Sequence, residues 1–213
     1  MIKEQGEFRW IEMGEGHPVI LLHGLMGGVE NFGEMTNYIS KEYKVYGLDL
    51  KLFEGNVLKV SVRKLSDYLY KFMETLNIPS AVLLGNSMGG HIGLIFAKEH
   101  PQMVDGLILT GSSGLYENSM GKSFPRRGDY EYIKKETEEV FYDPKVATKE
   151  LVDRVFKLAN TRMEMLKLLA YAKSAIRHNM AKDLPKIKQP ICLIWGENDK
   201  VTPAHVAEEF HEL

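Results

Sequence analysis

The sequence of 213 residues contains a single cysteine, Cys192, so no disulfide can form within the chain. Cys192 lies in the apolar run Ile191–Ile194, for which we expect a buried, unreactive thiol rather than a nucleophile. Histidine, cysteine and aspartate do not cluster at ligand spacing, so we expect no metal. The glycines of Gly24–Gly28 do not form G-x-G-x-x-G and no P-loop is present, so we expect no cofactor.

The sequence also lacks long apolar runs and an excess of charge of either sign. No apolar run approaches the roughly 20 residues that cross a bilayer, and residues 1–7 have no apolar core of a signal peptide. The 27 basic and 29 acidic residues give a formal net charge of -2, which is no electrostatic footprint for nucleic acid or an anionic membrane. We therefore expect a cytoplasmic protein without nucleic-acid or membrane partners.

The chain alternates apolar runs with amphipathic segments. Strands are predicted at Phe8–Met13, Pro18–Leu22, Lys44–Leu50, from Ala81 to the following turn, Val104–Gly111 and Pro190–Trp195. Helices are predicted at Glu30–Glu42, at Val62–Leu76, from Ser87 to about His100, and after Pro203. The alternation predicts an α/β fold with a mostly parallel sheet covered by helices on both faces.

Residues 112–188 interrupt this alternation with a polar stretch and three helical patterns, and they contain no strand candidate. We interpret 112–188 as a helical cap over the carboxyl ends of the strands, where open α/β sheets bind ligands. Residues 1–111 and 189–213 then form the core. The apolar cap residues are expected mostly to pack, and partly to line an acyl pocket: Met163, Met165, Leu166, Leu168, Leu169 and Tyr171. The pair Arg126–Arg127 is expected to be exposed, with steering of a carboxylate-bearing substrate left open.

One strand–turn–helix stretch predicts a nucleophile. Ser87 stands at the apex of a tight turn, with Gly85 and Gly89 two residues to either side. Glycine is needed there because the serine backbone is strained and neighbouring chain passes too close for a Cβ atom. Such a turn presents the hydroxyl at the top of the sheet. The alternative is a glycine-rich turn with an incidental serine.

Two other loops are predicted to reach the same edge of the sheet. Residues 23–28 follow the strand Pro18–Leu22, and the backbone N–H groups of Leu25 and Met88 are the expected donors to a developing oxyanion. Asp199 follows the last strand, where a carboxylate can orient a general-base histidine and stabilise its imidazolium.

Together these features resemble the α/β-hydrolase superfamily, in its lidded branch of esterase-like and C–C hydrolase-like enzymes. The motifs occur in family order: His23-Gly24, Asp49 after its strand, Gly85-x-Ser87-x-Gly89-Gly90 and Gly196-x-x-Asp199. The resemblance implies an α/β-hydrolase fold with a helical cap inserted after the sixth strand. It also implies that Ser87 is the nucleophile and Asp199 the triad acid, that Leu25 and Met88 supply the oxyanion hole, and that His23, Gly24, Gly85 and Gly89 support these motifs.

The chain departs from the family at two points. Where some relatives place the acid one strand earlier, residues 110–113 contain no carboxylate, which leaves Asp199 as the candidate. Lys51 stands where the family usually has proline, which is expected to alter the loop at the pocket mouth without touching the chemistry.

The triad histidine is not found after the acid. A helix, a strand and their connections need about 20 residues or more, whereas 14 follow Asp199 (213 − 199). We expect the histidine, the last strand and the last helix to lie beyond residue 213, in a truncated hydrolase; true loss of the base is the alternative.

None of the seven histidines in the sequence is a good candidate for the general base. His205 and His211 should lie on the flank of the sheet, away from Ser87. His91 should pack in its helix, and His23 should shape the oxyanion loop, with a direct substrate contact left open. The others should be exposed on loops or helix ends: His17, His100 and His178.

The first hypothesis is therefore a serine hydrolase of a small carboxylic ester, with a small-molecule acyl substrate as partner. Cleavage of a carbon–carbon bond in a diketone-like acid is the second. A non-catalytic ligand receptor of the same fold is the third. A homodimer is left open. Without the last strand, an apolar sheet edge should be exposed and prone to aggregation.

Overall fold

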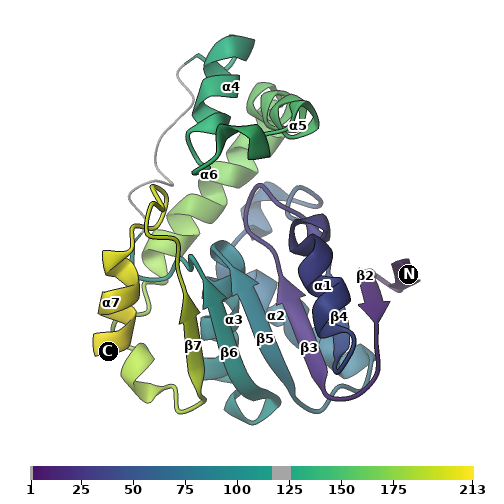
Figure 1. Ribbon diagram of the computed structural model, residues 1–213. Helices are drawn as coiled ribbons and strands as arrows, with labels where there is room; N and C mark the ends of the chain where they lie inside the picture. Colours follow the sequence, from purple (N-terminus) through teal and green to yellow (C-terminus); the bar gives the residue numbers. More distant parts are fainter. Residues whose placement is uncertain (1, 117–125) are drawn as a thin grey trace.

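The computed structural model describes residues 2–116 and 126–213, so part of the polar stretch at the start of the predicted cap lies outside the described residues. The described strands form one seven-stranded sheet in the order β1-β2-β4-β3-β5-β6-β7 (Figure 1). They are β1 (Ile2–Gln5), β2 (Phe8–Met13), β3 (Pro18–Leu22), β4 (Lys44–Leu48), β5 (Ala81–Asn86), β6 (Val104–Thr110) and β7 (Ile191–Ile194). Only the β1–β2 and β2–β4 pairs are antiparallel, which confirms a mostly parallel sheet.

Helices cover the sheet and build a cap above it. The core helices are α1 (Gly33–Ile39), α2 (Val62–Thr75), α3 (Met88–Glu99) and α7 (His205–Glu212). The cap helices are α4 (Tyr130–Glu138), α5 (Lys149–Asn160) and α6 (Arg162–Arg177). Short 3-10 turns are η1 (Val29–Phe32), η2 (Val57–Lys59), η3 (Pro101–Met103), η4 (Pro144–Val146) and η5 (Leu184–Lys186).

Local sequence explains most of these elements. Helix α2 begins where the Ser61 hydroxyl accepts the N–H of Lys64, and its apolar stripe, including Leu65, Leu69 and Phe72, is buried. Sequence patterns missed two features. Strand β1 pairs with β2 through a hairpin at Gly6, and the helix predicted over residues 30–42 is divided into η1 and α1 at Gly33, whose φ is 31°.

The two faces of the sheet have separate apolar cores. The larger core lies under α2, α3 and α7 and includes Leu83, Ile92 and Phe210. The smaller core lies with η1 and α1 on the other face and is built from Val19, Leu21, Phe32, Val45 and Leu84. In Figure 1, α1 lies in front of the sheet while β5, β6 and β7 are seen uncovered.

Strand β7 is an edge strand, and this corrects the prediction for Cys192. The thiol is exposed, as are Ile191 and Ile194. An apolar run was read as a buried strand, but burial also requires a neighbour on each side, and β7 pairs only with β6 among the described strands. The exposed apolar edge that was predicted is therefore present.

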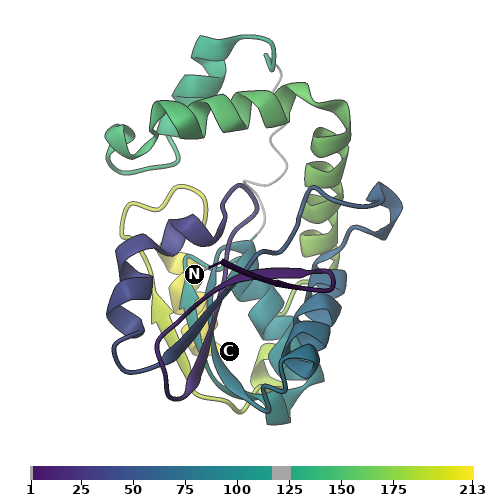
Figure 2. The ribbon, with the colours of Figure 1, turned by 90° about the vertical axis from the view of Figure 1, so that its right-hand side faces the viewer.

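The cap stands above the carboxyl ends of the strands, and α6 runs from the cap down to the core (Figures 1 and 2). Buried polar contacts fasten α6 to the core: Ser174 Oγ accepts the N–H of Val62 at 3.1 Å, and Lys167 Nζ donates to the Phe53 carbonyl at 2.6 Å. Tyr171 belongs to the main core. Helix α6 therefore forms the connection between the cap and the core.

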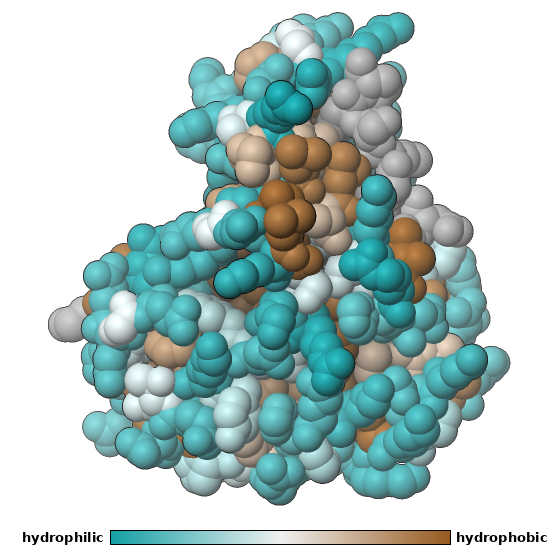
Figure 3. Space-filling model, turned by 180° about the vertical axis from the view of Figure 1, so that it is seen from behind, coloured by the Kyte–Doolittle hydropathy of each residue, from teal (hydrophilic) through white to brown (hydrophobic). Residues whose placement is uncertain are grey.

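Apolar side chains reach the surface where the cap meets the core (Figure 3). Helix α6 and η2 contact each other there. Their exposed apolar side chains are Leu58 of η2 and Met163, Leu166 and Ile176 of α6. The larger apolar clusters of both parts are internal.

Candidate active site

The register of the parallel strands brings the ends of five strands, and the segments that follow them, to one edge of the sheet. Leu22 at the end of β3 lies beside Leu48 of β4 and Gly85 of β5. Thr110 at the end of β6 lies beside Asn86 of β5 and Ile194 of β7. The segments that follow these strands therefore start side by side, below the cap.

Ser87 occupies the turn between β5 and α3 with φ 51° and ψ −119°, a conformation that non-glycine residues rarely adopt. Close packing leaves no room for a side chain at the neighbouring positions, so these must be glycine. A Cβ atom on Gly85 would collide with the backbone of Gly89 and Gly90, and one on Gly89 would collide with the Leu22 carbonyl. The turn has the strained strand-to-helix geometry that the sequence predicted.

The loop His23–Gly28 lies against this turn. A Cβ atom on Gly24 would lie 3.3 Å from the Ser87 Cβ and 3.2 Å from Asn86 Oδ1. The N–H groups of Leu25 and Met88, the predicted oxyanion donors, donate to no acceptor in the described part of the protein. Met88 also begins α3, whose N-terminal dipole favours negative charge.

His23 is buried and both of its ring nitrogens are held by backbone groups. Nδ1 donates to the Gly24 carbonyl at 2.9 Å, and Nε2 accepts the N–H of Leu50 at 3.1 Å, which assigns the proton to Nδ1. Burial lowers the pKa of His23, so the ring stays neutral near pH 7. His23 therefore shapes the loop, and it has no ring nitrogen left for the substrate contact that the sequence left open.

Asp49 follows β4 at the same edge of the sheet. Its carboxylate forms an ion pair with Arg9 at 2.6 Å and accepts the N–H of Lys51 at 3.0 Å. Lys51 has a φ of 49°, which proline cannot adopt because its ring fixes φ near −65°. The loop conformation thus accommodates lysine where the family resemblance led us to expect proline.

Asp199 lies beside the end of β6. Its Oδ1 accepts the N–H groups of Val201 at 2.8 Å and Thr202 at 2.9 Å. A Cβ atom on Gly111, the residue after β6, would lie 3.0 Å from Asp199 Oδ2. The Ser87 carbonyl in turn accepts the N–H of Ser113 at 3.1 Å. Ser87, after β5, and Asp199, after β7, therefore lie at the same edge of the sheet on either side of β6, and the carboxylate is fixed by its own loop.

No histidine ring within residues 2–116 and 126–213 hydrogen-bonds to the Ser87 hydroxyl or the Asp199 carboxylate; the backbone N–H of His91 donates to the Ser87 carbonyl at 3.3 Å in the first turn of α3. His17 bonds Asp105 at the opposite end of the sheet, and His91 is buried with Nε2 2.8 Å from the His178 carbonyl. His205 and His211 lie on the last helix, α7, as predicted, and both are exposed. The expectation of exposure was wrong for two others: His100 stacks on Tyr70, and His178 bonds the Ser174 carbonyl, so both are half-buried.

The cap reaches the site through apolar contacts. Leu25, Met26 and Phe53 of the core loops pack against the cap cluster of Ile133, Val155, Leu158, Ala159, Met165 and Leu168. Of the predicted apolar cap residues, Met165, Leu168 and Tyr171 are buried, Leu169 is half-buried, and Met163 and Leu166 are exposed. Arg126 and Arg127 are exposed, as expected.

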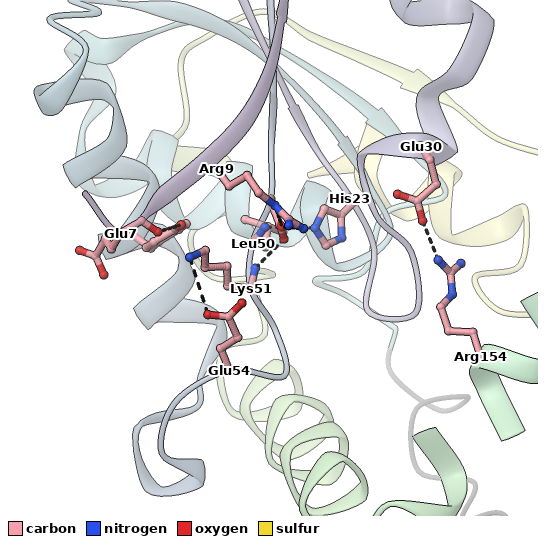
Figure 4. Close-up of polar contacts among 10 residues, drawn as sticks. Glu7, Arg9, His23, Glu30, Leu50, Lys51, Glu54 and Arg154 are labelled. Atoms are coloured by element: carbon pink, nitrogen blue, oxygen red, sulfur yellow. Dashed lines mark hydrogen bonds and ion pairs between the residues drawn. The ribbon is translucent and has the colours of Figure 1, made fainter. Parts of the chain in front are cut away.

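Sequence reasoning missed two polar contacts around the site. Asn86 Nδ2 donates to the Thr110 carbonyl and hydroxyl, both at 3.1 Å, which ties the turn to β6. Arg154 of α5 forms an ion pair with Glu30 of η1 at 2.6 Å (Figure 4). Its partners are 124 residues apart, so no sequence spacing could have predicted it.

Among the described residues, no three His, Cys, Asp or Glu side chains gather so that they could hold a metal ion. Nor does that part of the chain contain a helix long and apolar enough to span a membrane.

Comparison with known proteins finds relatives that match nearly the whole chain. A family model described as the alpha/beta hydrolase fold matches residues 17–213. The 2-hydroxy-6-oxo-6-(2'-aminophenyl)hexa-2,4-dienoic acid hydrolase of Metapseudomonas resinovorans is 30% identical over 230 residues, which cover 97% of this chain and 76% of that protein.

Solved structures are similar as well. MGS-MChE2, an alpha/beta hydrolase enzyme from the metagenome of sediments of the Mar Chica lagoon in Morocco, is 42% identical. It matches with a TM-score of 0.81 over 100% of this chain and 83% of its own. A meta-cleavage product hydrolase from Pseudomonas fluorescens IP01, 21% identical, has a TM-score of 0.79 over 97% of this chain and 82% of its own. At that identity the likeness concerns the fold.

Proposed function

The chain belongs to the alpha/beta hydrolase fold family, and on that premise we propose that it is a serine hydrolase of a small carboxylic ester. Ser87 is the nucleophile and Asp199 the acid of the triad. The N–H groups of Leu25 and Met88 form the oxyanion hole. The general base of this proposal is a histidine outside residues 1–213, because none of the seven histidine rings, all in the described part of the chain, bonds to the Ser87 hydroxyl or the Asp199 carboxylate.

One observation carries the proposal: a strained serine beside two unused backbone donors. Strain of this kind costs about 1–3 kcal/mol and persists where the surroundings impose it. At Ser87 the close approach of Gly85, Gly89 and Gly24 imposes it. The result is a hydroxyl at the end of β5, next to N–H groups that no protein acceptor in the described chain uses.

The chemistry follows from these positions. The base removes the Ser87 proton, Oγ bonds to the ester carbonyl carbon, and the carbonyl oxygen takes up negative charge between the two N–H groups. The carbon–alkoxy bond breaks, and the alkoxide leaves with the proton held by the base. Water then adds to the acyl-serine and releases the carboxylic acid and the free hydroxyl.

Imidazole in solution tests this arrangement because it can act as the base that the described residues do not supply. We expect p-nitrophenyl butyrate to be cleaved in the presence of imidazole at a rate above the imidazole background. Ser87→Ala should remove that excess, while Ser40→Ala, at the end of α1, should keep it. An excess that survives Ser87→Ala contradicts the proposal. Ser87-dependent turnover without imidazole would place the base among the seven histidines.

A second candidate is cleavage of a carbon–carbon bond in a 2-hydroxy-6-oxo acid. The names of several curated relatives favour it, among them a 2-hydroxy-6-oxo-6-phenylhexa-2,4-dienoate hydrolase of Comamonas testosteroni, 28% identical over 90% of this chain. The same imidazole assay with that dienoate distinguishes the two, since only the favoured substrate should show Ser87-dependent turnover. Binding without turnover of either would favour a ligand receptor.

A further inference from the structure

The ion pair between Arg154 and Glu30 joins the cap to the core on the surface of the protein. Arg154 lies on α5 and Glu30 in η1, directly after the predicted oxyanion loop (Figure 4). Burial would raise the pKa of Glu30, but its own backbone N–H and the Arg154 guanidinium outweigh burial and lower it. Both partners are therefore charged near pH 7. Their side chains are 47% and 59% exposed, so dissolved salt reaches the pair.

Glu30 and its neighbour Asn31 hold the end of the oxyanion loop. A Cβ atom on Gly28 would lie 2.7 Å from Glu30 Oε1, so the carboxylate lies directly against that glycine. The N–H of Gly28 donates to Asn31 Oδ1 at 2.7 Å, and the N–H of Gly27 donates to the Gly24 carbonyl at 3.2 Å. Glu30 and Asn31 therefore both contact Gly28, the last residue of the loop that contains Leu25.

The same loop meets α5 through apolar side chains. Leu25 and Met26 pack against the cluster that contains Val155 and Leu158 of α5. Helix α5 thus meets the loop through this cluster, and Arg154 adds a contact to Glu30, two residues beyond the loop. Helix α6 also contributes Met165 and Leu168 to the cluster, while its polar contacts to the core, through Lys167 and Ser174, are to residues outside the loop.

We propose that Arg154 is a positioning residue that acts through Glu30. The ion pair holds the loop His23–Gly28 in place. Docking of α5 on the core thereby determines the direction of the Leu25 N–H. The catalytic meaning of this coupling rests on the proposed function, in which that N–H contacts the oxyanion. The coupling itself is a property of the folded chain and can be measured without catalysis.

Hydrogen–deuterium exchange of the amides of residues 24–28 tests the proposal on the protein as it is. Arg154→Gln and Glu30→Gln should each speed exchange in this loop about two- to five-fold, the range of an exposed ion pair. Salt at about 0.5 M should speed exchange in the unaltered protein and have little effect in either variant. The exchanged pair, Glu30→Arg with Arg154→Glu, should restore much of the protection against exchange. If the single variants acted only through lost packing, the exchanged pair would not restore it.

Lys149→Gln supplies the matched control. It removes an ion pair to Asp153 on the same helix, at 2.5 Å and with both partners exposed, that does not reach the core. Exchange in residues 24–28 should be unchanged. The proposal is wrong if Arg154→Gln leaves the loop unchanged, or if Lys149→Gln speeds its exchange equally. These outcomes do not depend on Ser87 chemistry, so failure of the proposed function would leave them intact.

Discussion

At the scale of single residues, backbone geometry determines how the residues of the candidate site are placed. The alternation of glycines around Ser87 was enough to predict the tight turn, because only glycine fits where chains approach so closely. The role of Asn86 could not be predicted, since its partner Thr110 belongs to another strand. The tautomer of His23 was equally inaccessible, because it is set by a carbonyl and an N–H from two different loops.

Gly89→Ala tests the close packing of the turn. The new methyl group would collide with the Leu22 carbonyl, a backbone atom that cannot move without disturbing β3. We expect the free energy of unfolding to fall by about 3 kcal/mol or more. Urea denaturation followed by circular dichroism measures it. Gly128→Ala is the control, because a Cβ atom there has no neighbour within 4 Å; equal stability of the two variants would contradict the packing described.

His91 makes a pH dependence predictable. Burial lowers its pKa to about 4 in the folded protein, whereas the unfolded chain takes up the proton near pH 6.5. The unfolded state therefore binds more protons between these values, so the free energy of unfolding falls as pH drops through this window. Its contribution between pH 7.5 and pH 5 is about 2 kcal/mol.

Urea denaturation at both pH values checks this contribution. In His91→Gln, which keeps a donor toward the His178 carbonyl, the loss between pH 7.5 and pH 5 should be smaller by that amount. The exposed His211→Gln should keep the full loss. An unchanged pH dependence in His91→Gln would show that His91 does not titrate as described.

At the scale of elements, periodicity predicted the strands and helices well. It was least informative where tertiary contacts determine the bounds or the burial of an element. The helix predicted over residues 30–42 was divided at Gly33, and β1 was missed because its four exposed residues show no buried face. Cys192 was placed in a buried strand because an apolar run reveals a strand but not whether a neighbour covers it. Helix α6 was recognised, but not its attachment to the core.

Ser174→Ala tests that attachment. The Ser174 hydroxyl accepts the N–H of Val62, at the buried start of α2. Removing the hydroxyl leaves this N–H unpaired, so the free energy of unfolding should fall by about 1–2 kcal/mol in urea denaturation. Ser40→Ala removes an exposed contact to the Asn37 carbonyl and should change stability by less than about 0.5 kcal/mol. Equal effects would mean that the buried bond does not fasten α6.

At the scale of the whole molecule, the sheet has two very different edges. Strand β1 is exposed but carries Lys3 and Glu4, charges that oppose pairing with another chain. Strand β7 has the sequence Ile-Cys-Leu-Ile and exposes Ile191 and Ile194 without a charge. Among the described strands, β7 is therefore the edge at which association between copies of residues 1–213 should begin.

Ile194→Lys tests this asymmetry. The side chain is 53% exposed, so lysine should be accommodated with little loss of stability while it opposes edge-to-edge pairing. Light scattering during incubation should show slower aggregation. Ile2→Lys, at a residue 68% exposed on the opposite edge, is the matched control and should aggregate like the unaltered protein. The reverse order would locate the association at β1.

The central claim is that Ser87 is a nucleophile beside an oxyanion hole, and the most direct measurement is to locate the acyl group. The protein would be incubated with p-nitrophenyl butyrate and imidazole, quenched in acid, digested, and mapped by mass spectrometry. The account predicts one butyryl group, on the peptide that contains Ser87, and none in Ser87→Ala. Butyrylation spread over exposed lysines, or an unmodified Ser87 beside another modified residue, would contradict it.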